Sequence, residues 1–259
     1  MKNSKAKYVF DVVTLMPEMF MAISNYGVTG RAFKDKSVSL NLWNPREFTT
    51  DIYKTVDDKP YGGGPGMLMM AEPLVESIQA AKKRQRKIGV TRSKVIHMTP
   101  RGRLLSHNKV KKLLSLRGLV IIASRYEGID ERVNDWIDEE VSIGDFVMSG
   151  GELPAMAMMD SIIRQLPGVL NDAESASQDS FVNGLLDHSH YTRPEEFKKN
   201  KVPEVLLSGD HEKIRLWRLK ESLKITWKKR PDLLAEKLLT NEETRLLNEI
   251  KNEQEQGSG

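Results

Sequence analysis

The chain of 259 residues contains no cysteine. It therefore has no disulfide and no thiolate metal site, and it suits a reducing, cytoplasmic setting. No apolar run approaches the roughly 20 residues that cross a bilayer. The basic N-terminal segment is interrupted by Asp11, Pro17 and Glu18, which break the apolar core that a signal peptide needs. We expect a protein that does not associate with a membrane.

Two common nucleotide-binding fingerprints are also missing. The turn Ser149–Glu152 lies between a β-like run from Val141 to Met148 and a long apolar helix pattern that Pro167 ends. This turn is neither G-x-G-x-x-G nor a Walker A loop, so it indicates neither a nicotinamide nor an ATP site. A strand, a glycine turn and a helix still place backbone N–H groups at a helix N-terminus, where a polar ligand can be held.

Acidic residues are absent from residues 77–126, which carry fourteen Lys or Arg. Residues 127–196 carry sixteen Asp or Glu and three Lys or Arg, and residues 213–230 carry eight basic residues and one acidic. The net charge of +4 hides this segregation. A basic surface for a nucleic acid beside an acidic functional region is one interpretation, and solvated helix faces are the other.

Periodicity predicts an α/β fold. Strands are expected at 8–15, 38–43, 94–98 and 119–123, and helices at 17–24, 73–87 and 106–116. This alternation is typical of βαβ units and a mostly parallel sheet. Residues 44–66 are predicted to be loop, and their Gly- and Pro-rich end, 60–66, allows a close approach to a ligand.

The second part of the chain is predicted to be helical. Residues 171–180 are small and polar, which predicts a flexible linker between a domain at 1–170 and a domain at 181–250. Helices are expected at 193–199, 210–226 and 231–253, and the polar residues 251–259 are expected to form a disordered tail.

Eight segments together resemble the bacterial tRNA (guanine-N1)-methyltransferase family, a member of the SPOUT class of S-adenosylmethionine-dependent enzymes. The resemblance covers residues 8–247. The segments occur in the family's order: VTLMPEMF, TVDDKPYGGGPGMLM, SRYEGIDERV, SIGDFVMSGGELPAM, LPGVL, DSF, GLLDHSHYTRPEEF and VPEVLLSGDHEKIRLWRLKESL.

The resemblance implies a deep trefoil knot in the α/β domain, a small helical C-terminal domain that binds tRNA, and a homodimer with its active site between subunits. It implies methyl transfer to N1 of the guanine immediately 3′ of the anticodon, position 37. Periodicity could not predict the knot, because true knots are rare.

The resemblance also implies a catalytic pair. N1 of guanine carries a proton and becomes nucleophilic when a base removes it, while a cation stabilises the charge that develops on O6. Asp179 matches the family's base and Arg164 its cation. Without the resemblance, Asp179 would be interpreted as an N-cap and Arg164 as a snorkelling residue on an apolar helix.

S-adenosylmethionine is implied to bind to three loops at strand ends. The predicted residues are His97, Met98, Thr99, Pro100, Ser124, Arg125, Tyr126, Glu127, Gly128, Ile143, Gly144, Met148, Gly150, Gly151 and Pro154. His97 stands where the family often has tyrosine, and Ser124 where it often has glycine. Glu127 is expected near the charged end of the cofactor, although it could instead be a surface carboxylate paired with Arg125 or Arg132.

Metal binding is not predicted at a defined site. Asp187, His188 and His190 have residue types and a spacing that metal ligands can have. No cysteine or further histidine is near them in the sequence, so a structural zinc site is not expected. The family's reaction depends on Mg²⁺, which keeps several waters and needs only one or two carboxylates.

The tRNA is expected to contact Lys213, Arg215 and Arg218 through its phosphates and Asp187 through the target guanine. Asp187 could instead cap a turn or helix. Base flipping into the pocket beside Asp179 would supply specificity. Two other hypotheses remain: an RNA-binding protein that has lost catalysis, and a SPOUT enzyme that modifies another RNA position.

Overall fold

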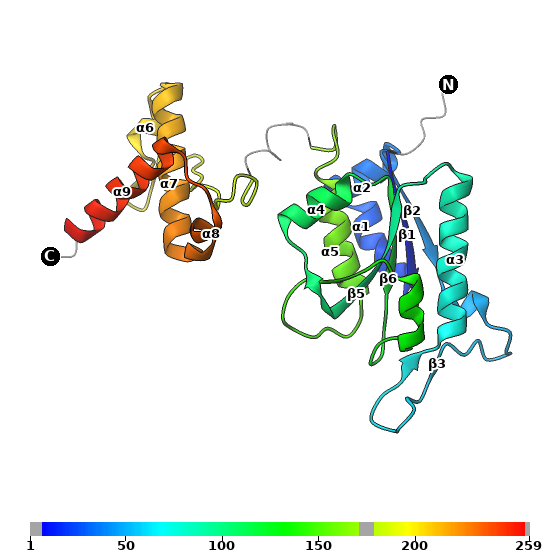
Figure 1. The fold of residues 1–259 in the computed structure, drawn as a ribbon. Coiled ribbons are helices and arrows are strands. Elements are labelled where there is room, and N and C mark those ends of the chain that lie inside the picture. Colours follow the sequence, from blue (N-terminus) through cyan, green and yellow to red (C-terminus); the bar gives the residue numbers. More distant parts are fainter. Residues whose placement is uncertain (1–6, 171–178, 257–259) are drawn as a thin grey trace. The chain divides into compact units, whose positions relative to one another are not determined.

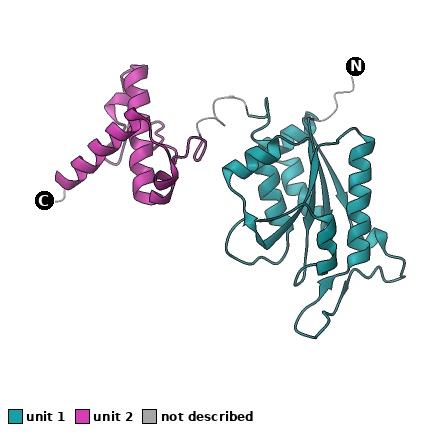
Figure 2. Cartoon of the chain, in the orientation of Figure 1, with its two compact units in different colours: residues 1–173 teal, residues 174–259 magenta. Residues whose placement is uncertain are grey.

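The computed structural model describes residues 7–170 and 179–256. The chain divides into two compact units, residues 1–173 and 174–259 (Figure 2). The predicted linker spans this division, and its residues 171–178 lie outside the described ones. Among the described residues, no helix combines the length and the apolar character that a membrane crossing needs.

Unit 1 is built on a five-stranded parallel sheet, so the predicted α/β class with a mostly parallel sheet is confirmed. The strand order is β2-β1-β6-β5-β7. The strands are β1 (Tyr8–Thr14), β2 (Val38–Trp43), β5 (Ser93–Leu104), β6 (Gly118–Ala123) and β7 (Glu139–Ser142). β1 and β6 are buried along their whole length, as expected for the centre of a sheet covered on both faces.

Helices cover both faces of this sheet (Figure 1). They are α1 (Met21–Asn25), α2 (Gly27–Lys34), α3 (Ala71–Lys87), α4 (His107–Leu114) and α5 (Glu152–Ile163). One core cluster joins one face of the sheet to α2, α4 and α5, and the other cluster joins the opposite face to α3. The alternating side chains of each strand therefore enter two separate apolar cores.

Shorter elements complete unit 1. They are the 3₁₀ helices η1 (Pro17–Phe20), η2 (Pro45–Phe48) and η3 (Glu131–Trp136), and the two-residue strands β3 (Asp57–Asp58) and β4 (Leu68–Met69). The helix predicted at 17–24 is therefore split into η1 and α1. The sequence pattern also did not predict α2, η2 and η3.

Unit 2 contains a hairpin and helices. Its elements are β8 (Glu196–Phe197), β9 (Asn200–Lys201), α6 (Glu204–Leu207), α7 (His211–Lys229), α8 (Pro231–Glu236) and α9 (Asn241–Gln256). The helix predicted at 193–199 is wrong. Lys198 and Lys199 have positive φ angles of 48° and 69°, which form the two-residue turn between β8 and β9.

The single helix predicted at 231–253 is also wrong, because a new helix begins after Thr240. The Thr240 side chain accepts a hydrogen bond from the Glu243 N–H at 3.2 Å, and the Glu243 carboxylate accepts one from the Thr240 N–H at 2.8 Å. This capping box starts α9. α9 continues to Gln256, so the predicted tail at 251–259 is helical over residues 251–256.

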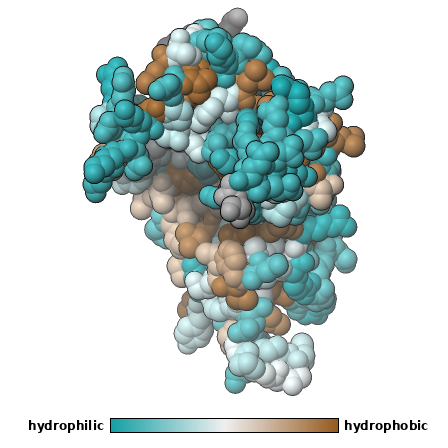
Figure 3. Space-filling view, turned by 90° about the vertical axis from the view of Figure 1, so that its left-hand side faces the viewer, coloured by the Kyte–Doolittle hydropathy of each residue, from teal (hydrophilic) through white to brown (hydrophobic). Residues whose placement is uncertain are grey.

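The face seen in Figure 3 carries both polar and apolar residues. Hydrophilic residues cover much of the face seen in Figure 3, with hydrophobic residues between them. This distribution agrees with a charged content of 29%.

A buried carboxylate fixes α3 to the centre of the sheet. Asp11 on β1 is fully buried and accepts hydrogen bonds from Trp43 at 2.8 Å, Gln85 at 2.9 Å and Arg84 at 3.0 Å. Burial raises the pKa of Asp11, and these donors lower it in part. The Gln85 amide also donates to the Leu119 carbonyl at 3.0 Å, which joins α3 to β6.

We predict that Asp11→Ala lowers the free energy of unfolding by about 3 kcal/mol. Removing one partner of a buried ion pair costs about 3–5 kcal/mol, and the low end applies because the Arg84 side chain is 28% exposed. Urea unfolding followed by tryptophan fluorescence measures the change.

Glu131→Ala is the control for Asp11→Ala. The Glu131 side chain is 71% exposed and pairs with Arg101 at 3.2 Å, so its removal should cost less than about 1 kcal/mol. Equal losses in the two variants would contradict the role given to Asp11.

Candidate active site

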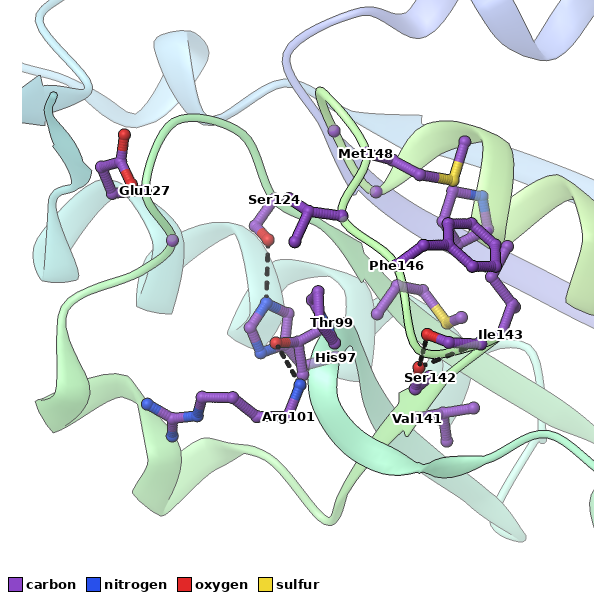
Figure 4. A pocket seen from close by; sticks show the side chains of 18 of the residues that line it. His97, Thr99, Arg101, Ser124, Glu127, Val141, Ser142, Ile143, Phe146 and Met148 are labelled. Carbon is purple, nitrogen blue, oxygen red and sulfur yellow. Dashed lines mark hydrogen bonds between the residues drawn. The ribbon is translucent and has the colours of Figure 1, made fainter.

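A pocket lies where the carboxyl ends of β6, β5 and β7 meet (Figure 4). These three strands are neighbours in the sheet and parallel, so the irregular part of β5 between Met98 and Arg103 and the loops after β6 and β7 converge at one edge. The cavity has a volume of about 330 Å³, which falls in the range of roughly 300–1,000 Å³ that is typical of small-molecule sites.

The pocket is lined by fourteen of the fifteen residues predicted to bind a cofactor. Four of them, His97, Met98, Thr99 and Pro100, lie within β5 and not, as the sequence had predicted, on a loop after it. The loop after β6 supplies Ser124, Tyr126, Glu127 and Gly128, and the segment after β7 supplies Ile143, Gly144, Met148, Gly150, Gly151 and Pro154. Arg125 is the exception, because its guanidinium contacts Glu152. The structure brings these residues together, and their cofactor-binding role stays a prediction.

Five lining residues were not predicted from the sequence: Arg101, Val141, Ser142, Phe146 and Val147. Most of them lie next to, or between, residues that were predicted to bind the cofactor. Their position in the same segments of the sequence could therefore have indicated them. The β-like run expected from Val141 to Met148 is wrong beyond Ser142, where β7 ends. The Ser142 hydroxyl donates to the Gly144 carbonyl at 2.9 Å and accepts from the Gly144 N–H at 3.1 Å. This local turn ends the strand.

His97 and Ser124, the two positions that depart from the family pattern, form one hydrogen-bonded pair. His97 Nε2 lies 2.9 Å from Ser124 Oγ (Figure 4). His97 Nδ1 is 3.5 Å from Glu140 Oε1, too far for a well-formed hydrogen bond, and it has no such bond among the described residues. Burial lowers the pKa of His97, and the Glu140 carboxylate offsets this in part. The pocket therefore contains a neutral imidazole at pH 7.

Glu127 lies on the loop after β6, to one side of the pocket, with Phe146 and Met148 on the other (Figure 4). The glycine-rich loop packs directly against it. Gly66 has a φ of 81°, a conformation that favours glycine, and a Cβ there would lie 2.4 Å from Glu127 Cγ. Among the described lining residues, Glu127 alone carries a carboxylate, and the pocket therefore combines an apolar side with one anionic group.

A buried glutamate joins the pocket loops to the sheet. Glu152, in the first turn of α5, is 1% exposed. Its Oε1 accepts hydrogen bonds from Thr14 Oγ1 at 3.0 Å and Arg125 Nε at 3.2 Å, and its Oε2 lies 3.0 Å from the same Arg125 nitrogen. The end of β1, the loop after β6 and the start of α5 are thereby held together.

The two glycines before Glu152 allow this close packing. A Cβ on Gly150 would lie 2.6 Å from Arg125 Nε and 2.6 Å from Glu152 Oε2. A Cβ on Gly151 would lie 2.8 Å from the Cα atom of Ala123. The Ser149–Glu152 turn can therefore approach β6 only because it lacks side chains at both positions.

The predicted catalytic residues occupy different units. Arg164 is the C-cap of α5 in unit 1, whereas Asp179 is the first described residue of unit 2. The N-cap alternative for Asp179 is wrong, since the first described helix after it begins at Glu204. The pairing of Asp179 with Arg164 stays a prediction.

Asp179 and Asp187 lie at the two ends of one tight loop. The Asp187 N–H donates to Ser180 Oγ at 2.9 Å, and the Phe181 N–H donates to the Leu185 carbonyl at 2.7 Å. The Leu186 N–H donates to Thr226 Oγ1 at 2.8 Å, which fixes the loop to α7. The structure thus brings the backbone of Asp187 next to Ser180, the residue that follows Asp179.

The predicted phosphate-binding cations on α7 differ in their surroundings. Arg215 is held by Glu212 and Glu242, each through contacts of 2.8–2.9 Å, and their hydrogen bonds raise the pKa of its guanidinium. Lys213 pairs with Asp210 at 3.2 Å. Arg218 is exposed and forms no ion pair within the described part of the chain, so it is the strongest phosphate-binding candidate of the three.

Comparison with known proteins identifies related sequences. The family described as tRNA (Guanine-1)-methyltransferase TrmD matches residues 8–236. A protein of Methylobacillus flagellatus named tRNA (guanine-N(1)-)-methyltransferase is 60% identical over 95% of this chain and 94% of its own length. A protein of the same name from Nitrosospira multiformis is 58% identical over 93% of this chain and 96% of its own length. Another, from Burkholderia multivorans, is 57% identical over 89% of this chain and 89% of its own length.

We predict that Glu152→Gln lowers the free energy of unfolding by about 2 kcal/mol. The substitution removes the charge that faces Arg125, and the value is below the roughly 3–5 kcal/mol of a fully buried pair because the Arg125 side chain is 21% exposed. Denaturant unfolding at pH 7 measures the loss.

Glu72→Gln is the matched control for this change. Glu72 also lies in the first turn of a helix, α3, but is exposed. Glu72→Gln should lower the free energy of unfolding by only about 0.3–1 kcal/mol, the usual contribution of a negative charge that interacts with the helix dipole. If Glu72→Gln cost as much as Glu152→Gln, the buried contact with Arg125 would not be the cause.

Proposed function

The chain belongs to the tRNA (guanine-1)-methyltransferase TrmD family, and we propose that the pocket at the ends of β5, β6 and β7 is its methyl-transfer site. The family and relatives at 54–60% identity give the reaction as methylation of N1 of a guanine in tRNA. The guanine immediately 3′ of the anticodon, position 37, is the proposed target. The observation that carries the assignment is the convergence of three separate family segments on one pocket.

Methyltransferases of this family use S-adenosylmethionine in general, and the residues present fit it. Ile143, Phe146 and Met148 offer apolar and aromatic surface for an adenine ring. Backbone groups of the irregular part of β5 and of the loops after β6 and β7 supply hydrogen-bonding edges. Glu127 supplies an anion for a positively charged group. When bound, the cofactor provides an electrophilic methyl group on its sulfonium.

The residues of the protein must make N1 of the guanine nucleophilic. In this proposal Asp179 takes the N1 proton, and Arg164 stabilises the negative charge that develops on O6. Asp187, at the other end of the Asp179 loop, would contact the same base. A carboxylate is suited to this step only when the guanine has been flipped out of its stack.

The remaining family features belong to the same proposal. They are a trefoil knot in unit 1, tRNA binding by the helices of unit 2, and a homodimer whose active site lies between subunits. Mg²⁺ dependence is included, with its ligands unassigned, because Mg²⁺ needs only one or two carboxylates besides water. A cytoplasmic location follows from the tRNA substrate.

Methyl transfer to a tRNA transcript tests the function. With labelled S-adenosylmethionine and Mg²⁺, the wild-type chain should label a transcript that has guanine 3′ of the anticodon and not one that has adenine there. Asp179→Asn should lower the rate by about 10²–10⁴-fold, the usual contribution of a general base. The exposed Asp35→Asn is the matched control and should retain full activity.

Other outcomes of this assay are equally informative. Label in both transcripts would overturn the position and keep the methyltransferase. Binding of cofactor and tRNA without any transfer would favour an RNA-binding protein. Full activity of Asp179→Asn would overturn the proposed base.

We predict that Arg218→Ala weakens tRNA binding and lowers the slope of log affinity against log salt by about 0.7–0.9, the value for one phosphate contact. Arg215→Ala should change both quantities less, because Glu212 and Glu242 already neutralise that guanidinium. Filter binding over a range of KCl concentrations measures both. A larger slope change for Arg215→Ala would reverse the assignment.

A further inference from the structure

Two imidazoles and a carboxylate face one another on residues 187–190 of unit 2. One potential ligand atom from each of Asp187, His188 and His190 lies within 4.8 Å of the other two. His190 Nε2 is 2.9 Å from Asp187 Oδ2, and His188 Nε2 is 3.8 Å from Asp187 Oδ1. The two histidine rings are 4.3 Å apart between centroids. The three side chains therefore form one cluster.

His188 is oriented as a metal-ligating histidine usually is. Its Nδ1 lies 3.0 Å from the Ser189 carbonyl oxygen, which can only accept, so this nitrogen carries the proton. The Nε2 lone pair is then directed toward Asp187. Ligating histidines commonly donate their second ring N–H to a backbone carbonyl in this way, which fixes both tautomer and orientation.

The surrounding structure holds the cluster in place. Ser189 Oγ donates to Glu221 on α7 at 3.1 Å, and the His188 ring packs edge-on against Trp217 at 6.3 Å. The His188 N–H donates to Asp187 Oδ1 at 2.8 Å. The ligand atoms are thus anchored from two directions, while the His190 side chain is 68% exposed and leaves a path to solvent.

We propose that Asp187, His188 and His190 bind one divalent first-row transition-metal cation, such as Zn²⁺, in an open site completed by water. Bonds of about 2.0–2.1 Å at tetrahedral angles place neighbouring ligand atoms about 3.4 Å apart. Here one ligand atom of each residue lies within 4.8 Å of the other two, so binding would need only small side-chain shifts and would replace the hydrogen bond of His190 to Asp187. The absence of cysteine excludes a thiolate site, but an open site needs only three protein ligands.

The ligand set also selects the metal. Imidazole nitrogen favours Zn²⁺, Ni²⁺, Co²⁺ and Cu²⁺, whereas Mg²⁺ prefers an all-oxygen octahedral shell. The site is therefore distinct from any Mg²⁺ requirement of the methyl transfer. It shares Asp187 with the proposed guanine contact, so this carboxylate would serve either the metal or the base.

Isothermal titration calorimetry of the full chain with ZnCl₂, in a buffer that does not chelate metals, tests the site. We expect one saturable Zn²⁺ site per chain that excess Mg²⁺ does not displace. His190→Gln and Asp187→Asn should each weaken binding at least about tenfold. His211→Gln, an exposed histidine at the start of α7, should bind as tightly as the wild type.

A second measurement distinguishes ligand loss from misfolding. Co²⁺ bound through the cluster should give the intense visible absorption of a low-coordinate site, and His190→Gln should lose it while keeping the circular dichroism and melting temperature of the metal-free wild type. No saturable Zn²⁺ binding, or equal binding by wild type, His190→Gln and Asp187→Asn, would overturn the proposal.

Discussion

The contact of Glu152 with Arg125 and Thr14 is the interaction on which the pocket depends. It joins the end of β1, the loop after β6 and the first turn of α5 in one buried group. A charge is costly to bury unless it is paired, so these three segments are fixed relative to one another whenever unit 1 is folded. The glycines at 150 and 151 are required because the same contact leaves no room for side chains.

The pocket in turn depends on strand order. β6, β5 and β7 are adjacent and parallel, so part of β5 and the loops after β6 and β7, which are distant in sequence, meet at one edge. A neutral His97, an apolar group around Phe146 and the Glu127 carboxylate then face one cavity. This combination suits a ligand that has an aromatic part and a positive charge, which is the chemistry of the proposed methyl donor.

Unit 2 presents a different kind of surface. The loop of residues 179–187 carries two carboxylates and is fixed to α7 by Thr226. The same helix carries Arg218, whereas Arg215 is engaged by carboxylates of unit 2 itself. Formal charge in the sequence therefore overstates the cationic surface that α7 offers to a polyanion, because neighbouring acidic residues neutralise part of it.

The sequence by itself determined the α/β class, the four predicted strands of the sheet and the family, because periodicity and ordered motifs are local properties of the chain. It also named most of the pocket-lining residues, through family resemblance. It failed at residues 193–199, where a two-residue turn makes a hairpin, and at Thr240, where a capping box interrupts a helical pattern. Only the tertiary structure decided that His97 meets Ser124 and that Glu152 is buried against Arg125. Each of these contacts depends on the distance and direction between side chains, which spacing along the chain does not specify.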